Sequence, residues 1–324
     1  MLTKLKLVKG AVDTKNLVPV LTHFHIDMGK VQGGNGRVTI QVQGISELAD
    51  FDNVTCKADA FVDAIESCDD TEPTITRDAE YVHFTAGRFK CKVQRIPEEL
   101  FATYPVATPD PARYTIQEPL LPALTLLRKF VGEDASRPWA VGAWFDIGGW
   151  VYGTNNVTIA RVELPAAKLF GHSINVPNYV LDELLRISRE PICMGLSDNS
   201  VTFYYDDGMW LQGRLLVNDW PAVHEWFEAK PTVVKKVPAR MLEEVLRISA
   251  FTLDKKNPII YIAEGELVCG NASVSGFKLP EGAYRTEPLE LVLSHATHVN
   301  FAAYPGRVYW RGANVEGFFV GVKT

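Results

Sequence analysis

The chain has 324 residues, of which 47% are hydrophobic and 22% are charged, and this is the composition of a globular protein with room for two or three domains. The net charge of −6 disfavours a uniformly basic nucleic-acid binder, although it does not exclude a basic face on an otherwise acidic surface. There is no run of about 18 apolar residues and no apolar signal core near the start, so we expect a cytoplasmic protein without a membrane segment.

Three segments with the alternating pattern of strands recur along the chain, each close to a proline. Pro19, Pro138 and Pro258 lie about 120 residues apart, and each marker is followed by a strand pattern, a Gly-containing turn and a second strand pattern. This period matches the size of a small domain. The sequence therefore predicts three similar domains, which span residues 1–107, 108–231 and 232–324.

Helices are predicted where apolar residues recur at i, i+3 and i+4 spacing. They cover residues 2–12, 58–68, 122–131, 177–190, 238–250 and 294–304. Two of these helices contain nearly the same hexapeptide, Glu183–Ser188 and Glu244–Ser249, at about half the main period. Each domain is therefore expected to consist of two related halves. Because alternating strands fill the intervals, we predict an α+β fold with helices on one face of antiparallel sheets.

Lysine and arginine recur on the side of these helices that lies opposite the apolar stripe. They are Lys4, Lys6, Lys9, Arg128, Lys129, Arg186, Arg189, Arg240 and Arg247. One interpretation is a solvated helix face with local ion pairs, because Asp182 and Arg186 have the required i, i+4 spacing. The other is a DNA-facing surface, which the recurrence at equivalent places favours because a symmetric ring would direct all of these cations inward.

The repeat and several short motifs together resemble the bacterial beta-type DNA polymerase sliding clamp, the DNA polymerase III beta subunit family, over nearly the whole chain. Thr154–Ala160 stands where the family has Thr-Asp-Gly-His-Arg-Leu-Ala, and Arg214–Pro221 is similar to its Leu-Ile-Asp-Gly-Arg-Phe-Pro segment. The resemblance implies three repeated clamp domains, each of two βαβββ-like halves, with sheets outside and helices lining a central hole. It also implies a homodimer ring that encircles double-stranded DNA without sequence preference, and a processivity factor that has neither an enzymatic activity nor a cofactor.

Partners of this family, among them DNA polymerase and the clamp loader, insert short hydrophobic peptides into a pocket between the second and third domains. Matching the motifs residue by residue assigns this pocket to Trp139, Thr154, Ile159, Pro221, Trp226, Phe318 and Val320. Each of these residues taken singly fits a domain core equally well. Their convergence from three distant segments favours a pocket.

The chain departs from the family pattern at three places. It begins at its first helix, so an initial strand is expected to be missing or replaced, and it ends in Val-Lys-Thr. In the turn at residues 155–158, asparagine, valine and threonine replace the family's charged and glycine residues. We therefore expect a cognate peptide unlike the common bacterial one, which would suit a phage-encoded clamp.

Two other classes of function remain open. A metal-dependent hydrolase could use His23, His25 and Asp27, because alternate residues of a strand share one face, although the sequence offers no clear fourth ligand. A repeat scaffold that does not bind DNA would also show the repeat. The five scattered cysteines form no C-x-x-C pair, and Gly33–Gly36 lacks the lysine of a phosphate loop, so neither motif indicates a further site.

Overall fold

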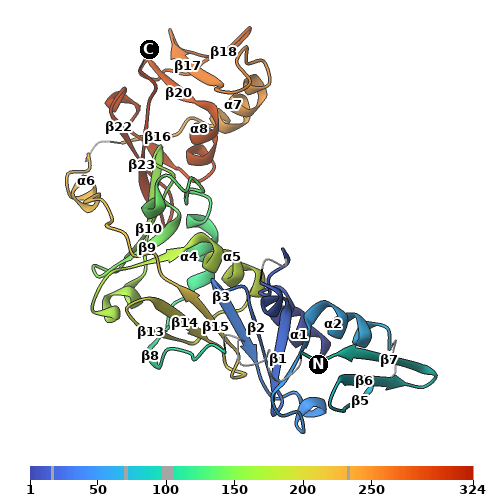
Figure 1. The fold of residues 1–324 in the computed structure, drawn as a ribbon. Coiled ribbons are helices and arrows are strands. Elements are labelled where there is room, and N and C mark those ends of the chain that lie inside the picture. Colours follow the sequence, from blue (N-terminus) through green and yellow to red (C-terminus); the bar gives the residue numbers. More distant parts are fainter. Residues whose placement is uncertain (16–17, 69–71, 97–105, 232–233, 324) are drawn as a thin grey trace. The chain divides into compact units, whose positions relative to one another are not determined.

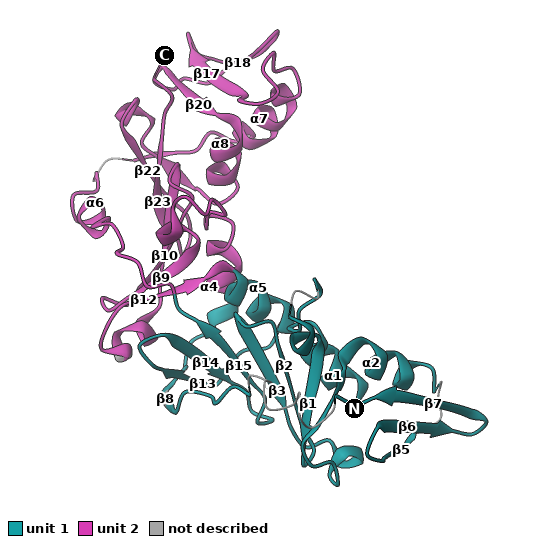
Figure 2. Cartoon of the chain, in the orientation of Figure 1, with its two compact units in different colours: residues 1–121, 179–215 teal, residues 122–178, 216–324 magenta. Residues whose placement is uncertain are grey.

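The computed structural model describes residues 1–15, 18–68, 72–96, 106–231 and 234–323. The chain divides into two compact units, drawn in different colours in Figure 2. Unit 1 consists of residues 1–121 and 179–215, and unit 2 of residues 122–178 and 216–324. No helix among the described residues is long and apolar enough to span a bilayer.

Within the described ranges, the order strand, helix, strand, strand, strand recurs six times, and the first copy begins at its helix. The first two copies contain α1 (Leu2–Lys9), β1 (His23–Asp27), β2 (Lys30–Gly34) and β3 (Val38–Val42), then β4 (Val54–Lys57), α2 (Ala58–Glu66), β5 (Thr74–Arg77), β6 (Tyr81–Ala86) and β7 (Phe89–Gln94). The next two contain β8 (Ala112–Thr115), α4 (Leu120–Leu127), β9 (Gly142–Asp146), β10 (Trp150–Thr154) and β11 (Thr158–Glu163), then β12 (Ile174–Pro177), α5 (Asn178–Ile187), β13 (Cys193–Leu196), β14 (Ser200–Tyr204) and β15 (Trp210–Arg214).

The last two copies contain β16 (Lys235–Lys236), α7 (Met241–Ser249), β17 (Ile259–Ala263), β18 (Glu266–Cys269) and β19 (Ala272–Ser275), then β20 (Gly282–Arg285), α8 (Thr286–Leu293), β21 (His298–Val299), β22 (Arg307–Arg311) and β23 (Glu316–Val320). The short helix α6 (His224–Glu228) precedes β16, and single 3-10 turns cover Pro19–Thr22, Ser46–Leu48, Pro138–Ala140, Pro165–Phe170 and Phe301–Ala303. The predicted α+β fold is thereby confirmed.

The described residues of each unit form one eight-stranded antiparallel sheet and one smaller sheet. The strand orders in unit 1 are β4-β1-β2-β3-β15-β14-β13-β8 and β5-β6-β7, and those in unit 2 are β12-β9-β10-β11-β23-β22-β21-β16 and β19-β18-β17-β20. At the middle of each large sheet, the last strands of two copies pair, β3 with β15 and β11 with β23. The last strands of the two remaining copies, β7 and β19, lie at sheet edges.

The helices pack on these sheets through the apolar stripes that the sequence shows. In α5 the buried side chains are Val180, Leu181, Leu184 and Ile187, and in α7 the stripe includes Met241, Val245 and Ile248. Helices of consecutive copies also meet in pairs, α1 with α2 and α7 with α8 (Figure 1). One side of each helix is thus fixed against apolar neighbours, and its charged side remains at the surface.

The helix predicted at residues 294–304 is wrong. The helix of this copy, α8, ends at Leu293, and the residues that follow form β21 and a 3-10 turn. His298 and Val299 pair with β16 on one side and with β22 on the other, so long-range strand pairing decides their conformation. Pro288 lies in the first turn of α8, where its missing N–H costs little.

Candidate functional site

Two of the three lysines of α1 in unit 1 are held by carboxylates of α2. Lys6 Nζ lies 2.6 Å from Glu66, and Lys9 Nζ lies 3.0 Å from Asp59. The hydrogen bond from Lys9 to Asp59 raises the pKa of the lysine despite its partial desolvation, so Lys9 stays charged at neutral pH. Lys4 donates to the backbone carbonyl of Gln43 at 2.7 Å. These lysines therefore lie beside acidic and polar partners.

The two copies of the repeated hexapeptide contain the same ion pair. Arg186 lies 2.5 Å from Glu183 in α5, and Arg247 lies 2.6 Å from Glu244 in α7. In unit 1, Arg186 also donates from Nη2 to the carbonyl oxygen of Leu7, at 2.8 Å, and so joins α5 to α1. The arginine that the repeat places at equivalent positions thus has a local acidic partner in both copies.

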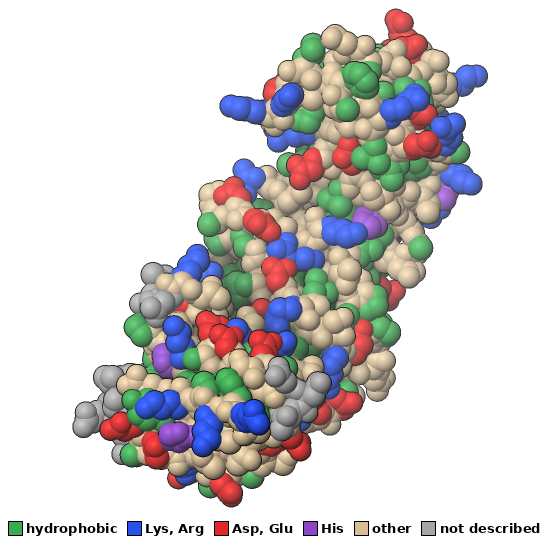
Figure 3. All heavy atoms as spheres, turned by 90° about the vertical axis from the view of Figure 1, so that its right-hand side faces the viewer, with side chains coloured by type: hydrophobic (Ala, Val, Ile, Leu, Met, Phe, Trp, Pro, Cys, Tyr) green, Lys and Arg blue, Asp and Glu red, His purple; other side chains and the backbone are tan. Residues whose placement is uncertain are grey.

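Most of the other cations predicted to face DNA are paired as well. Arg128 lies 2.9 Å from Glu133, and Arg189 bridges two aspartates of the β14–β15 turn. Arg240 lies 3.0 Å from Glu243, whereas Lys129 is exposed and forms no ion pair with a described residue. Lysine and arginine side chains are correspondingly interspersed with aspartate and glutamate on the face drawn in Figure 3. An exposed ion pair contributes roughly 0–1 kcal/mol, so phosphate groups can compete for these cations.

Unit 2 presents an aromatic surface on one face of its large sheet. The buried residues at its base are Tyr152, Ile159, Val223, Phe227, Tyr309 and Phe318, and Trp144, Trp150, Trp220, Trp226 and Val234 pack against them. The ring of Phe227 lies 5.0 Å from that of Phe318, and Trp226 meets Phe318 edge-on at 6.4 Å. Trp220 stacks on Trp144, with their rings 5.5 Å apart and 6° from parallel. The segment around α6 is therefore fastened to the sheet by its aromatic side chains.

An ion pair lies within this aromatic surface. The Arg161 guanidinium lies 3.9 Å from the ring centre of Trp150 and 4.0 Å from that of Phe227, and its Nη2 lies 2.6 Å from Glu316. Burial alone would raise the pKa of Glu316, but hydrogen bonds from Lys230, Tyr309 and Arg161 outweigh that effect and hold its pKa below the usual range. Glu316 is therefore ionised at neutral pH, and through Lys230 it also holds the residues next to α6.

All seven residues predicted for the partner pocket belong to unit 2, but they differ in accessibility. Ile159 and Phe318 are buried opposite each other on paired strands, and Trp226 covers Phe318. Trp139, Pro221 and Trp226 are half-buried, whereas Val320 is 40% exposed. The hydroxyl of the buried Thr154 donates to the carbonyl of Thr158 at 2.8 Å and so holds the β10–β11 turn.

Several residues of the aromatic surface were not among those predicted from the sequence. Trp144 and Trp220 form its stacked pair, Phe227 lies at its centre, and Arg161 lies between two of its rings. Trp144 had a usable signal, because it lies in the strand pattern that follows Pro138. Arg161 had none, since its carboxylate partner is 155 positions away in the sequence.

The histidines of β1 have partners other than a metal ion. His23 Nδ1 lies 2.8 Å from the carbonyl oxygen of Pro19, and His25 Nε2 lies 3.3 Å from Asn53 Oδ1. Burial lowers the pKa of both histidines. Across the described residues, no three His, Cys, Asp or Glu side chains are grouped so that they could hold a metal ion. The hydrolase interpretation based on His23, His25 and Asp27 is therefore not favoured.

No family model and no curated protein sequence matches the chain. Solved structures do match, over all of this chain and 97% of theirs. Similar structures include the DnaN sliding clamp (DNA polymerase III subunit beta) of Bartonella birtlesii bound to griselimycin (TM-score 0.81, 16% identity), the DNA polymerase sliding clamp of Caulobacter crescentus (0.82, 14%), and the Helicobacter pylori beta clamp bound to a DNA ligase peptide (0.76, 10%).

Proposed function

We propose that this chain, which has the fold of the bacterial beta sliding clamps, is itself a DNA sliding clamp. In this function a ring encircles duplex DNA without sequence preference and tethers a DNA polymerase as a processivity factor, without catalysis or a cofactor. The observation that carries the proposal is the sixfold element order along the described chain, because equivalent units joined in one direction can close into a ring. Domains at 1–107, 108–231 and 232–324 would each contain two copies, and the ring would act in the cytoplasm.

The strand pairing inside each unit supports a proposal for how the ring would close. The last strands of two copies meet in both large sheets, and β7 and β19 are the corresponding strands that remain at edges. We propose that β7 of one chain pairs with β19 of a second, so that two chains form a head-to-tail homodimer. Leu246, Phe251 and Leu253, on α7 and just after it, are exposed apolar side chains that a second chain could cover.

The helix cations would provide the contact with DNA. Seven of the nine lysines and arginines of the predicted DNA-facing set are held by carboxylates, and pairs with both side chains exposed, such as Lys6–Glu66 and Arg240–Glu243, each contribute roughly 0–1 kcal/mol. Phosphate groups can therefore replace the carboxylates at little cost. Contacts of this kind depend on salt and not on base sequence, which permits a ring to slide.

The aromatic surface would receive partner proteins. We assign it the seven predicted pocket residues together with Trp144, Trp220 and Phe227, which lie in the same cluster. Tryptophan side chains supply large apolar contact areas and are common at the energetic centres of interfaces. DNA polymerase and the clamp loader would each dock there through a short hydrophobic peptide.

Topological retention on DNA tests the proposal. The purified protein would be assembled on a nicked circular plasmid, and free protein would be removed by gel filtration. We expect the protein to stay with the circle and to be released when a restriction enzyme linearises it, because a ring can slide off only at a DNA end. A stable monomer that is not retained on the circle would contradict the proposal, and a scaffold that does not bind DNA would give that result.

A further inference from the structure

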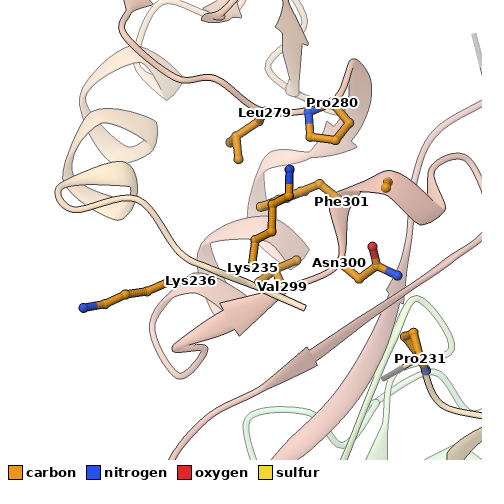
Figure 4. Close-up of a pocket in the computed structure, with 9 residues that line it drawn as sticks. Pro231, Lys235, Lys236, Leu279, Pro280, Val299, Asn300 and Phe301 are labelled. Atoms are coloured by element: carbon orange, nitrogen blue, oxygen red, sulfur yellow. The ribbon is translucent and has the colours of Figure 1, made fainter. Parts of the chain in front are cut away.

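A cavity of about 360 Å³ opens at the β16 edge of the large sheet in unit 2 (Figure 4). Its walls are mainly apolar, with Leu279 and Pro280 on one side and Val299 and the buried Phe301 on another. The volume falls in the range of about 300–1,000 Å³ that is usual for ligand pockets. The cavity can therefore hold one or two apolar side chains of a partner.

The strand β16 places a lysine at this cavity. β16 is the last strand of its sheet, and it pairs with β21 in the register Lys235 to Val299 and Lys236 to His298. Side chains alternate along a strand, and Figure 4 shows Lys235 directed toward Leu279 and Pro280, with Lys236 directed away. One ammonium group thus lies beside the apolar walls and a second lies on the opposite face of the strand.

These two lysines differ from most of the helix cations in their partners. No carboxylate of the described residues forms an ion pair with Lys235 or Lys236, and both side chains are exposed. An occupant that brings negative charge therefore gains an attraction that no described residue already satisfies, and an occupant with an apolar side chain also gains burial. An acidic segment with apolar anchors has both properties.

The cavity is distinct from the aromatic surface. Val299 pairs with Trp310, so the cavity lies on the Trp310 face of the sheet. The neighbouring residue Tyr309, which belongs to the aromatic surface, points to the other face because side chains alternate. A ligand in the cavity would therefore leave the aromatic surface accessible.

We propose that this cavity is a second docking site, which binds an extended acidic peptide of a partner protein. The peptide adds to the free edge of β16, inserts apolar side chains between Leu279 and Phe301, and places carboxylates near Lys235 and Lys236. This assignment goes beyond the clamp function and does not depend on it, because the binding requires neither DNA nor a closed ring.

The test uses a fluorescein-labelled peptide, Asp-Asp-Leu-Asp-Phe-Asp-Asp, with the full-length protein in a polarisation titration. We expect saturable binding that weakens as salt is added, and about tenfold weaker binding by the double variant Lys235→Glu, Lys236→Glu. The matched control is Lys255→Glu, Lys256→Glu, an exposed lysine pair of the same unit outside the cavity, which should leave the affinity unchanged. Leu279→Asp should weaken binding as well, because it places a like charge in the wall.

Several outcomes would overturn the assignment. One is the absence of saturable binding, and another is an equal loss in both lysine double variants. Equal affinity for a peptide with asparagine in place of aspartate would remove the charge argument. Direct binding of decanoate without binding of the peptide would indicate a small amphiphile, and a changed oligomeric mass of the Lys235→Glu, Lys236→Glu variant would indicate a second copy of the chain. Unfolding curves of all variants verify that each is folded.

Discussion

The pair Arg161–Glu316 and the pair Arg240–Glu243 have the same chemistry but different surroundings. The first lies within the aromatic surface, with side chains 10% and 13% exposed, and the second lies at the start of α7, with side chains 68% and 63% exposed. Removal of one partner of the buried pair leaves a charge that water hardly reaches. In the exposed pair, water readily solvates whichever partner remains. Burial therefore makes one pair a fixed part of the fold and leaves the other open to exchange for phosphate.

The largest expected effect comes from removing the buried carboxylate. Glu316→Ala leaves Arg161 without its ion pair and also frees Lys230, so we expect unfolding to require about 3–5 kcal/mol less free energy. Urea denaturation followed by tryptophan fluorescence would measure the change. Glu243→Ala is the matched control and should change stability by less than about 0.5 kcal/mol. Equal effects of the two substitutions would remove the distinction between the pairs.

The second-largest expected effect is on peptide binding by Trp226, which belongs to the aromatic surface that contains the buried pair. Trp226 packs edge-on against Phe318, and Arg307 lies 4.3 Å from the centre of its ring. If Trp226 anchors partner peptides, Trp226→Ala should lower the affinity for a labelled peptide by about tenfold or more, where the peptide carries a Leu-Phe pair with neutral polar flanks. Tyr261→Ala, which removes an exposed aromatic ring of β17 in the same unit, is the control. Unchanged binding by the Trp226 variant would show that the peptide docks elsewhere.

A smaller effect is expected at the exposed pair. Arg240→Ala should leave stability nearly unchanged, weaken duplex DNA binding a few-fold at low salt, and reduce the slope of log affinity against log salt by roughly 0.9. Polarisation of a labelled duplex across a salt series would measure both quantities. Arg311→Ala, an exposed arginine on β22, should not change the slope. A slope that is equally altered by both substitutions would argue against a DNA-facing role for the helix cations.

The two regions also differ in how far their sequences reveal them. The helices α5 and α7 can be predicted from local spacing, because apolar residues at i, i+3 and i+4 are typical of an amphipathic helix. The position of their arginines on the opposite side follows from the same spacing. The aromatic surface depends on contacts between strands far apart in the chain, such as Ile159 opposite Phe318. Motif matching found those two residues, but it could not show that Trp226 covers Phe318 or that Arg161 lies beneath α6.

The same limit explains the misplaced last helix. Residues 286–293 and 294–304 both offer apolar side chains at helical spacing, so local spacing alone does not choose between them. The pairing of β21 with β16 and β22, which no local pattern records, removes residues 298–299 from any helix. Long-range strand pairing thus determines the conformation of residues whose local spacing would also fit a helix.

The smallest expected effect is the pH dependence of the buried pair. The hydrogen bonds to Glu316 hold its pKa in the folded protein below the value of about 4.3 for a free glutamate. The unfolded chain therefore takes up this proton first, so the contribution of the carboxylate is fully present above that value and is lost as pH falls through the lower folded pKa. Stability measured between pH 7 and pH 3 should fall less steeply in Glu316→Gln than in the unaltered protein. The pKa of Glu243 is also lowered, but its side chain is exposed. Glu243→Gln should therefore reduce the slope of stability against pH by less than Glu316→Gln does.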